Sequence, residues 1–228
     1  MIAANDELWA TSSAGGTGNS GSVFKMTQAG VVSSVVSFTG TAGANPGSSP
    51  QAALILGTDG NHWGTTSGGG SGTSGTIFKM TPAGVQTVVI NFTGTSGANL
   101  GSSPQAPLTL GNDTNYYGTT TTGGTGGGFG TIYKLTPGGV LTPLVHFTGS
   151  GGANPGQSPQ GPMPQGADGN FYGATSLGGV NGFGTVFKVT PAGVMTSLAS
   201  FTGTTGALRG NSPTSGLYAG GDGHFYGT

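Results

Sequence analysis

The stretch DGNFYGATSLGGVNGFGTVFKVTPAG, which runs from Asp168 to Gly193, combines aromatic and β-branched residues with a glycine-rich centre. FYGATS and GTVFKVT have the composition of β-strands, and the glycines between them suit a connecting loop. Closely similar stretches occur elsewhere, for example TDGNHWGTTS followed by GTIFKMTPAG. A segment that is this short and this rich in glycine cannot bury a hydrophobic core by itself. We therefore expect its copies to pack on one another.

Several markers recur at steps of 54, 55 and 54 residues. The phenylalanine of an FTG motif is found as Phe38, Phe92, Phe147 and Phe201, and the proline of an SPQ or SPT motif as Pro50, Pro104, Pro159 and Pro213. We therefore interpret residues 1–228 as a single repeat domain. Its units are about 1–47, 48–101, 102–156 and 157–210, with a partial unit at 211–228.

Each period predicts four strands, as the second unit shows. They are QAALILG, an apolar run expected to be buried on both faces, then HWGTTS, GTIFKMT and VQTVVINF. TDGN and PAG predict the turns, and we expect a positive φ at Gly84. Four strands in about 50 residues, repeated, are typical of a β-propeller blade. The predicted fold is all-β, a propeller of four-stranded blades of about 54 residues, with four blades in this chain.

The ends of the chain leave two arrangements open, because the second strand occurs five times and the third and fourth strands four times. A four-bladed ring could close with SGLYAGG (215–221) beside the N-terminal strands, which leaves GHFYGT surplus. Alternatively, the chain is a fragment of a larger ring, and two copies pair through open blade edges into an eight-bladed homodimer. The stop at FYGT slightly favours the second arrangement.

The composition excludes several classes of protein. Charged residues make up 5% of the chain, and the net charge is −1. We therefore expect no binding to nucleic acid. No apolar run approaches the about 18 residues of a transmembrane helix, so we expect no membrane insertion. Without cysteine the chain has no disulfide and no thiolate metal site, and we expect no metal and no cofactor.

Most ionisable residues occupy two repeat positions. Four lysines recur in the third strand (Lys25, Lys79, Lys134 and Lys188), and four aspartates recur in the first turn (Asp59, Asp113, Asp168 and Asp222). One carboxylate in each TDGN-type turn is too few for a calcium loop, so we interpret these aspartates as hairpin-turn residues. We predict that Lys79 lies within ion-pair reach of a turn aspartate.

The remaining ionisable residues offer no recognisable site. His62, His146 and His224 occupy non-equivalent positions without metal-ligand spacing, so we interpret them as ordinary substitutions. Asp6 and Glu7 are the only neighbouring acids, and as adjacent strand residues they should point to opposite faces. An enzyme would require residues such as Glu7, His146, His224 and Arg209 to gather in one pocket.

A polar set before the first strand of each unit is the candidate binding site. GANPGSSPQ, GANLGSSPQ and GANPGQSPQ would place amides at the mouth of a central channel, and GALRGNSPT makes one side different. The candidate residues are Asn45, Gln51, Asn99, Gln105, Asn154, Gln160 and Arg209. Neutral amides with nearby aromatic rings suit carbohydrate or peptide ligands. The structural alternative is that the amides cap backbone groups of the loops.

The elements DGNFYGATSLGG, GTVFKVTPAG and SFTG resemble the Gloeo/Verruco (GloVer) tandem repeat of bacterial choice-of-anchor proteins, over essentially the whole chain. The resemblance implies a propeller-like, extracellular or cell-surface bacterial protein, although MIAANDELWATSS lacks the features of a signal peptide. We predict a non-catalytic binding or scaffold propeller that contacts carbohydrate or protein. The alternative is a propeller-type glycoside hydrolase or polysaccharide lyase with a site at the channel mouth.

Overall fold

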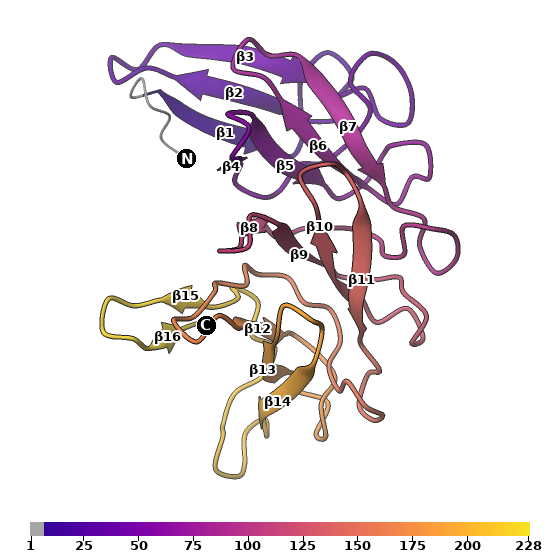
Figure 1. Ribbon diagram of the computed structural model, residues 1–228, viewed down its shortest axis with the longest axis vertical. Helices are drawn as coiled ribbons and strands as arrows, with labels where there is room; N and C mark the ends of the chain where they lie inside the picture. Colours follow the sequence, from indigo (N-terminus) through magenta and orange to yellow (C-terminus); the bar gives the residue numbers. More distant parts are fainter. Residues whose placement is uncertain (1–6) are drawn as a thin grey trace.

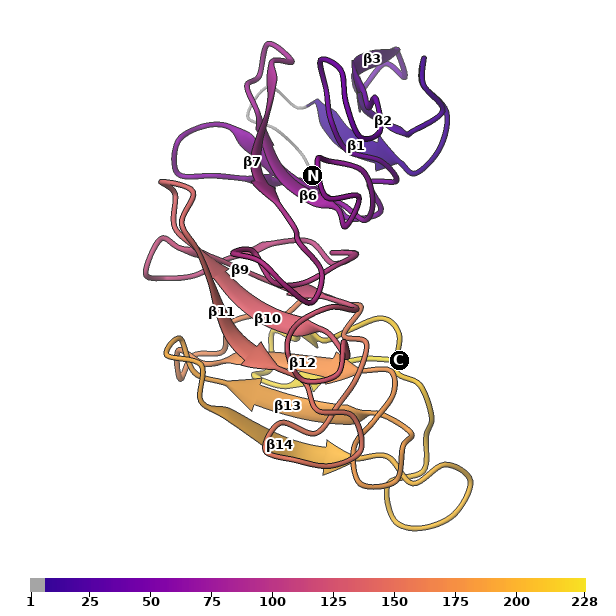
Figure 2. The same ribbon diagram turned by 90° about the vertical axis from the view of Figure 1, so that its right-hand side faces the viewer.

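The computed structural model of the chain describes residues 7–228, which form β-strands, turns and loops. Five antiparallel sheets follow one another along the chain, one for each repeat unit. Figures 1 and 2 show that they fan out in an open arc, with the first sheet at one end and the last at the other. The short strands β4, β8 and β15 lie along the inner side of this arc, and β3, β7, β11 and β14 lie along its outer side. The described residues include no helix long and apolar enough to cross a membrane.

The two central sheets have four strands each, in the order of the chain from the inner side outward. The strands of the second repeat are β4 (Ile55–Leu56), β5 (His62–Thr66), β6 (Thr76–Met80) and β7 (Gln86–Asn91). Those of the third repeat are β8 (Thr109–Leu110), β9 (Tyr116–Thr120), β10 (Thr131–Leu135) and β11 (Leu141–His146). Pro143 lies in the outermost strand β11, where a missing N–H is tolerated because the edge of the sheet is free.

The other three sheets have fewer strands. The first consists of β1 (Leu8–Ser12), β2 (Ser22–Met26) and β3 (Val32–Ser37). The fourth consists of β12 (Phe171–Thr175), β13 (Thr185–Val189) and β14 (Met195–Ser200), and the last of β15 (Tyr218–Ala219) and β16 (Phe225–Tyr226). In the fourth repeat, a single bridge between Gln165 and Phe171 stands in place of an inner strand.

The inner strands are shorter than the sequence predicted. Of QAALILG only Ile55–Leu56 pairs as a strand, because part of this run bonds to the preceding repeat. The hydroxyl of Thr11 donates to the carbonyl of Ala52 at 3.0 Å, and Thr65 donates in the same way to Ala106 at 3.3 Å. The predicted positive φ at Gly84 is confirmed, with a value of 89°.

The hydrophobic core lies between the repeats. Three clusters of buried residues each join two neighbouring repeats, and the central one contains Trp63, Ile77, Ile90, Phe92, Leu108, Tyr116, Tyr133 and Leu135. The first four of these residues come from the second repeat and the others from the third. Each sheet is therefore stabilised by its neighbours, as the composition of a single repeat required.

Glycine in the second strand makes room for an aromatic ring of the third strand. Gly64 is paired with Phe78, and a Cβ atom at Gly64 would lie 2.6 Å from Leu54 Cδ2 and 2.7 Å from Phe78 Cζ. Gly118 faces Tyr133 and Gly173 faces Phe187 in the same register. The WGT and YGT patterns thus let the rings lie flat across the neighbouring strand.

The four-bladed ring that closes within one chain is not formed. It required residues 215–221 to pair with the N-terminal strands, but β15 pairs with β16 instead. Within residues 7–228 the first sheet contains β1, β2 and β3 alone. The segment MIAA and Asp6, for which the sequence suggested an inner strand and a turn, lie outside the described residues.

Candidate functional site

The connections between strands form two faces of the arc. What we call the turn face carries the tight turns after the first and third strands of each repeat: 27–31, 57–61, 81–85, 111–115, 136–140, 166–170, 190–194 and 220–224. The loop face carries the longer connections at the opposite strand ends: 13–21, 39–50, 67–75, 93–104, 121–130, 148–159, 176–184 and 202–213. Because the strands are antiparallel, successive connections alternate between these faces.

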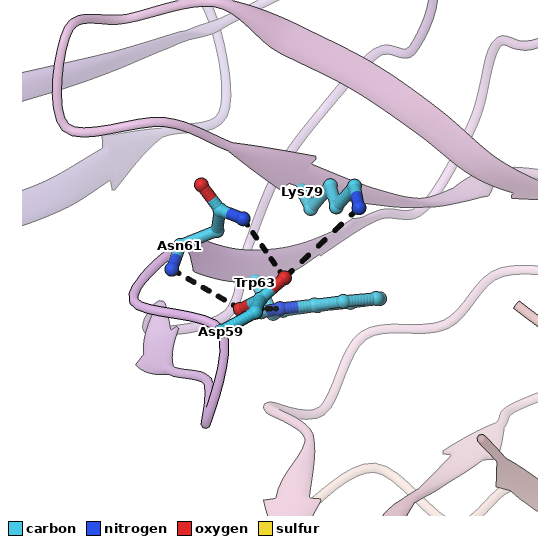
Figure 3. Close-up of polar contacts among 4 residues, drawn as sticks. All are labelled: Asp59, Asn61, Trp63 and Lys79. Atoms are coloured by element: carbon cyan, nitrogen blue, oxygen red, sulfur yellow. Dashed lines mark hydrogen bonds and ion pairs between the residues drawn. The ribbon is translucent and has the colours of Figure 1, made fainter. Parts of the chain in front are cut away.

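Four turns of the turn face, those that follow the first strand of a repeat, are each organised around one aspartate, and Figure 3 shows the turn at Asp59. Asp59 accepts hydrogen bonds from the backbone N–H of Asn61 and from Trp63 Nε1, both at 3.1 Å, and from Asn61 Nδ2 at 2.8 Å. Lys79 Nζ lies 4.0 Å from Asp59 Oδ2. This is an Asx-type turn that also holds an aromatic side chain. The interpretation of the aspartate as a turn residue and the prediction for Lys79 are both confirmed.

The same arrangement recurs with tyrosine in place of tryptophan. The hydroxyl groups donate to the turn carboxylates in the pairs Tyr117–Asp113 at 2.8 Å, Tyr172–Asp168 at 2.9 Å and Tyr226–Asp222 at 2.5 Å. In Asp59, partial burial opposes ionisation, but the hydrogen bonds from Asn61 and Trp63 and the nearby Lys79 lower the pKa overall. In Asp168 the hydrogen bonds from Asn170 and Tyr172 lower the pKa. These carboxylates are therefore ionised at neutral pH.

The lysines serve the same clusters. Lys79 Nζ lies 5.7 Å from the ring centroid of Trp63, and Lys25 Nζ lies 5.5 Å from that of Trp9. Lys25 also forms an ion pair with Glu7 at 2.9 Å. Much of the charge on the turn face is thus used to fix the turns and aromatic rings.

Those aromatic rings in turn join one repeat to the next. The second residue of each aromatic pair lies against the first residue of the following pair. The ring centroids are separated by 4.2 Å in Trp9–His62, 4.5 Å in Trp63–Tyr116, 4.0 Å in Tyr117–Phe171 and 4.3 Å in Tyr172–Phe225. Asp59, Asp113 and Asp168 therefore each position one ring in three of these four stacks. Together the stacks form a ladder of rings across the boundaries between the described repeats.

The three asparagines of the candidate site lie in segments of the loop face, and each of the three glutamines follows directly after such a segment. The three asparagines close the loops between repeats, because Nδ2 donates to the carbonyl of the residue eight positions earlier: Asn45 to Ser37, Asn99 to Asn91 and Asn154 to His146, at 3.2, 3.2 and 3.3 Å. These contacts match the capping alternative for the asparagines. The NH₂ groups of Asn45, Asn99 and Asn154 consequently support the loops that present the other side chains.

The glutamines and Arg209 are more accessible. Gln51 is exposed and donates a long hydrogen bond of 3.5 Å to Ser67 Oγ. Gln160 is partly buried and donates to Ser176 Oγ at 3.4 Å. Gln105 is partly exposed and Arg209 is exposed. Within the loop-face segments Arg209 is the single charged residue, so this face is almost neutral.

Sequence reasoning missed an apolar part of the loop face in the third and fourth repeats. Phe183 and Leu177 are 37% and 42% exposed, and Val180 is 78% exposed. Phe129 holds the position equivalent to Phe183 and is partly exposed. The available signal was a departure from the repeat pattern, because the first two repeats have Ser20 and Ser74 at this position.

The backbone conformation of the serine in the SPQ and SPT motifs is a second feature that the sequence did not reveal. Ser49, Ser103, Ser158 and Ser212 all have φ between 52° and 56°, an uncommon conformation for a residue other than glycine. The N–H of Ser158 donates to the carbonyl of Phe129, and that of Ser212 to the carbonyl of Phe183, both at 3.0 Å. These serines thus tie each loop between repeats to the preceding glycine-rich loop.

The unique ionisable residues are distributed over different repeats. Glu7 pairs with Lys25 in the first repeat, whereas Arg209 lies in the loop after the fourth sheet. His146 Nδ1 accepts from the N–H of Thr125 at 3.3 Å, much as Asn91 Oδ1 accepts from Ser71. His146 therefore makes the contact that Asn91 makes in the preceding repeat, as expected for an ordinary substitution. No group of three metal-ligating residues occurs in the part of the chain that the structure describes.

The fold and these two faces define a propeller-like repeat protein. The chain belongs to the Gloeobacter/Verrucomicrobia repeat family, whose pattern matches residues 1–228. No curated protein sequence matches the chain significantly.

Solved structures share the fold at low sequence identity. Virginiamycin B lyase from Staphylococcus aureus, in a catalytically inactive H270A form with quinupristin, is 14% identical with a TM-score of 0.57; the match covers 100% of this chain and 67% of that protein. A streptogramin B lyase is 16% identical with a TM-score of 0.58, and the match covers 97% of this chain and 58% of that protein. An extracellular domain described as part of a hybrid two-component system of B. thetaiotaomicron is 12% identical with a TM-score of 0.61. This match covers 98% of this chain and 25% of that protein. The chain thus spans between a quarter and two thirds of these proteins, and the similarity establishes a propeller-like fold.

Proposed function

We propose that the protein is a non-catalytic binding propeller of the bacterial cell surface, and that its loop face binds carbohydrate. The observation that carries this proposal is the segregation of charge. Arg209 is the single charged residue of the loop-face segments, and exposed apolar groups such as Phe183 lie on the same face. A neutral surface with amides and aromatic rings offers hydrogen bonds to hydroxyl groups and ring faces to sugar C–H groups.

The binding surface is centred on the third and fourth repeats. Gln160 follows the loop that Ser158 ties to Phe129, and Arg209 lies in the loop that Ser212 ties to Phe183. An amide, two aromatic rings and one cation are therefore held on adjacent loops. The equivalent loops of the first two repeats offer serine in place of the rings. Protein ligands with similar neutral polar surfaces are the alternative partners.

For the assembly we propose that the chain supplies four blades. The four sheets with a second, third and fourth strand each provide one blade, and β15 and β16 begin another. Two such chains make an eight-bladed ring, at the upper end of the usual range of about four to eight blades.

Affinity electrophoresis in gels that contain soluble bacterial or plant polysaccharides tests the proposal. The wild-type chain should be retarded in at least one gel. The variants Phe183→Ala and Gln160→Ala should lose at least half of the retardation, because both remove a side chain of the proposed binding surface and neither residue belongs to a hydrophobic core cluster. Val85→Ala is the matched control, since Val85 is 63% exposed on the turn face. Loss of retardation in the control alone, or no retardation in any gel, would overturn the proposal.

One observation favours a second candidate, a propeller-type glycoside hydrolase or polysaccharide lyase. A cavity of about 510 Å³ on the turn face is lined by Gln165, Asp168, Tyr172 and His224, among others. Asp168 is ionised at neutral pH, because its pKa is lowered by the hydrogen bonds from Asn170 and Tyr172. In this candidate its carboxylate is the proton acceptor, with His224 as the nearby imidazole. Formation of soluble products from a polysaccharide would distinguish this candidate from the binding propeller.

A further inference from the structure

The glycine-rich loop 121–130 of the third repeat is fixed at its tip by one side chain. The N–H of Thr125 donates to Nδ1 of His146 at 3.3 Å, and the glycines 126–128 follow directly. His146 is the last residue of β11, which lies beside β10 (Figure 1). Because glycine leaves a loop much conformational freedom, the position of this tip depends strongly on its few contacts.

The second repeat makes the same contact with an amide in place of the imidazole. There the N–H of Ser71 donates to Oδ1 of Asn91 at 2.9 Å. An amide oxygen accepts a hydrogen bond at any ordinary pH, whereas the Nδ1 atom of an imidazole accepts only while it is unprotonated. The third repeat therefore has a titratable acceptor where the second repeat has a permanent one.

The loop that His146 anchors carries a ring of the proposed binding surface. Phe129 is partly exposed on the loop face, and two backbone segments pack against its ring. A Cβ atom at Gly127 would lie 2.7 Å from Phe129 Cε2, and one at Gly149 would lie 3.1 Å from the same atom. Gly127 belongs to the tip, two residues after Thr125. Movement of the tip therefore removes one side of the support of this ring.

The surroundings of His146 contain no charge that favours its protonation. The loops around its ring contain no ionisable residue: 93–104, 121–130 and 148–159. In β10 the ionisable residues are Tyr133, which is fully buried in the core, and Lys134, whose charge acts on Asp113 of the turn face. Burial lowers the pKa of His146 below 6.5. The imidazole is therefore neutral at pH 7 and can accept the bond from Thr125.

We propose that His146 is a pH-sensitive anchor: its neutral imidazole holds the tip of loop 121–130, and protonation releases the tip and weakens ligand binding at Phe129. Opening of the loop frees the imidazole to take up a proton, so acid favours the open loop. The anchor is complete above about pH 6.5 and is lost as the pH falls towards the lowered pKa. The effect on binding rests on the proposed carbohydrate-binding function, whereas the anchor itself does not.

Amide exchange measured by NMR on the full chain tests the anchor. From about pH 7.5 to pH 5.5, the protection factor of the Thr125 amide should fall by up to about tenfold for each pH unit, because opening takes up one proton. The protection factor of the Ser71 amide should stay constant, since Asn91 does not titrate, and it reports any general loosening of the fold.

Two reciprocal variants separate the titration of His146 from other effects of acid. His146→Asn supplies the acceptor that Asn91 supplies in the second repeat, so protection of Thr125 should no longer depend on pH. Asn91→His should transfer the pH dependence to the Ser71 amide. Equal protection of Thr125 at both pH values in the wild type, or the same pH dependence in His146→Asn, would overturn the inference.

Beads that carry the polysaccharide that retards the wild-type chain test the consequence for binding. The wild type should be retained less at the lower pH, in proportion to the loss of the closed loop, and His146→Asn should be retained equally at both pH values. An equal pH dependence in the two proteins would overturn the link between the anchor and binding. If no polysaccharide retains the wild type, the proposed function is wrong, and the exchange data still decide the anchor.

Discussion

The indole ring of Trp63 lies stacked on the phenol ring of Tyr116 in the next repeat, with centroids 4.5 Å apart and planes inclined by 28°. Asp59 holds the same indole through Nε1, and Lys79 lies above it. A local turn in one repeat therefore determines how the next repeat packs. This relationship explains why aspartate and the aromatic pair recur together.

Removal of a ring from this ladder should destabilise the protein strongly. Trp63 is fully buried, so Trp63→Ala should lower the free energy of unfolding by about 3–5 kcal/mol. Tyr226→Ala removes the equivalent residue at the open end of the arc, where the ring is 57% exposed, and should have a much smaller effect. Urea denaturation followed by tryptophan fluorescence and circular dichroism checks the difference. Equal losses for the two variants would contradict the role of stacking between repeats.

A methyl group at Gly64 should disturb the second sheet. Its Cβ would lie within 2.7 Å of both Leu54 and Phe78, so Gly64→Ala should cost about 1–3 kcal/mol. The first repeat has Ala10 at the equivalent position, opposite the partly exposed Phe24. Ala10→Gly is therefore the matched change at an end that is not closed, and it should cost less. Thermal unfolding of both variants provides the comparison.

The turn carboxylates should contribute to stability above acid pH. The folded pKa of Asp59 lies below its usual value of 3.8. Stability from this group is therefore present above that value and is lost as the pH falls through the folded pKa. Asp59→Ala should cost about 1 kcal/mol at pH 7, because hydrogen bonds are lost, and the cost should shrink near pH 3. A cost that is the same at both pH values would contradict the assigned ionisation.

His62 should make the first boundary between repeats sensitive to acid. Its side chain is 3% exposed and stacked on Trp9, and within the described residues neither ring nitrogen has a hydrogen-bond partner. Burial lowers its pKa below 6.5, so the unfolded chain takes up the proton first. Stability is complete above about pH 6.5 and falls as the pH drops towards the lowered value.

The variant His62→Phe tests this effect, because Phe171 occupies the equivalent position in the fourth repeat. It should be more stable than the wild type at pH 5 and should depend less on pH between 5 and 7. The control is His224→Asn, at a histidine whose side chain is 77% exposed. The account is wrong if His62→Phe leaves the slope of stability against pH unchanged while His224→Asn removes it.

Much of the fold could be predicted because its determinants are local and repeated. The turn at Asp59 and the strands around it depend on residues a few positions apart, so the TDGNHW pattern was sufficient. The predicted length of the inner strand was wrong, because the carbonyl of Ala52 accepts a hydrogen bond from the hydroxyl of Thr11 in the preceding repeat. The stacks between repeats could not be predicted either, since they depend on how one sheet is rotated against the next.

The loop face shows the same limit. Asn45 could be interpreted as a capping residue from its loop, and its contact with Ser37 is local. The aromatic part at Phe129 and Phe183 was missed because sequence comparison among repeats emphasises what all copies share. A binding surface instead arises where copies differ, and its exposure depends on the packing of two adjacent loops.

The most direct test of binding without catalysis is mass spectrometry of the soluble fraction after incubation with each polysaccharide that retards the protein. The account predicts retention of the protein by the polysaccharide and no new soluble oligosaccharides above a heat-denatured control. New oligosaccharides that disappear with Asp168→Asn would contradict it and would place a catalytic site on the turn face.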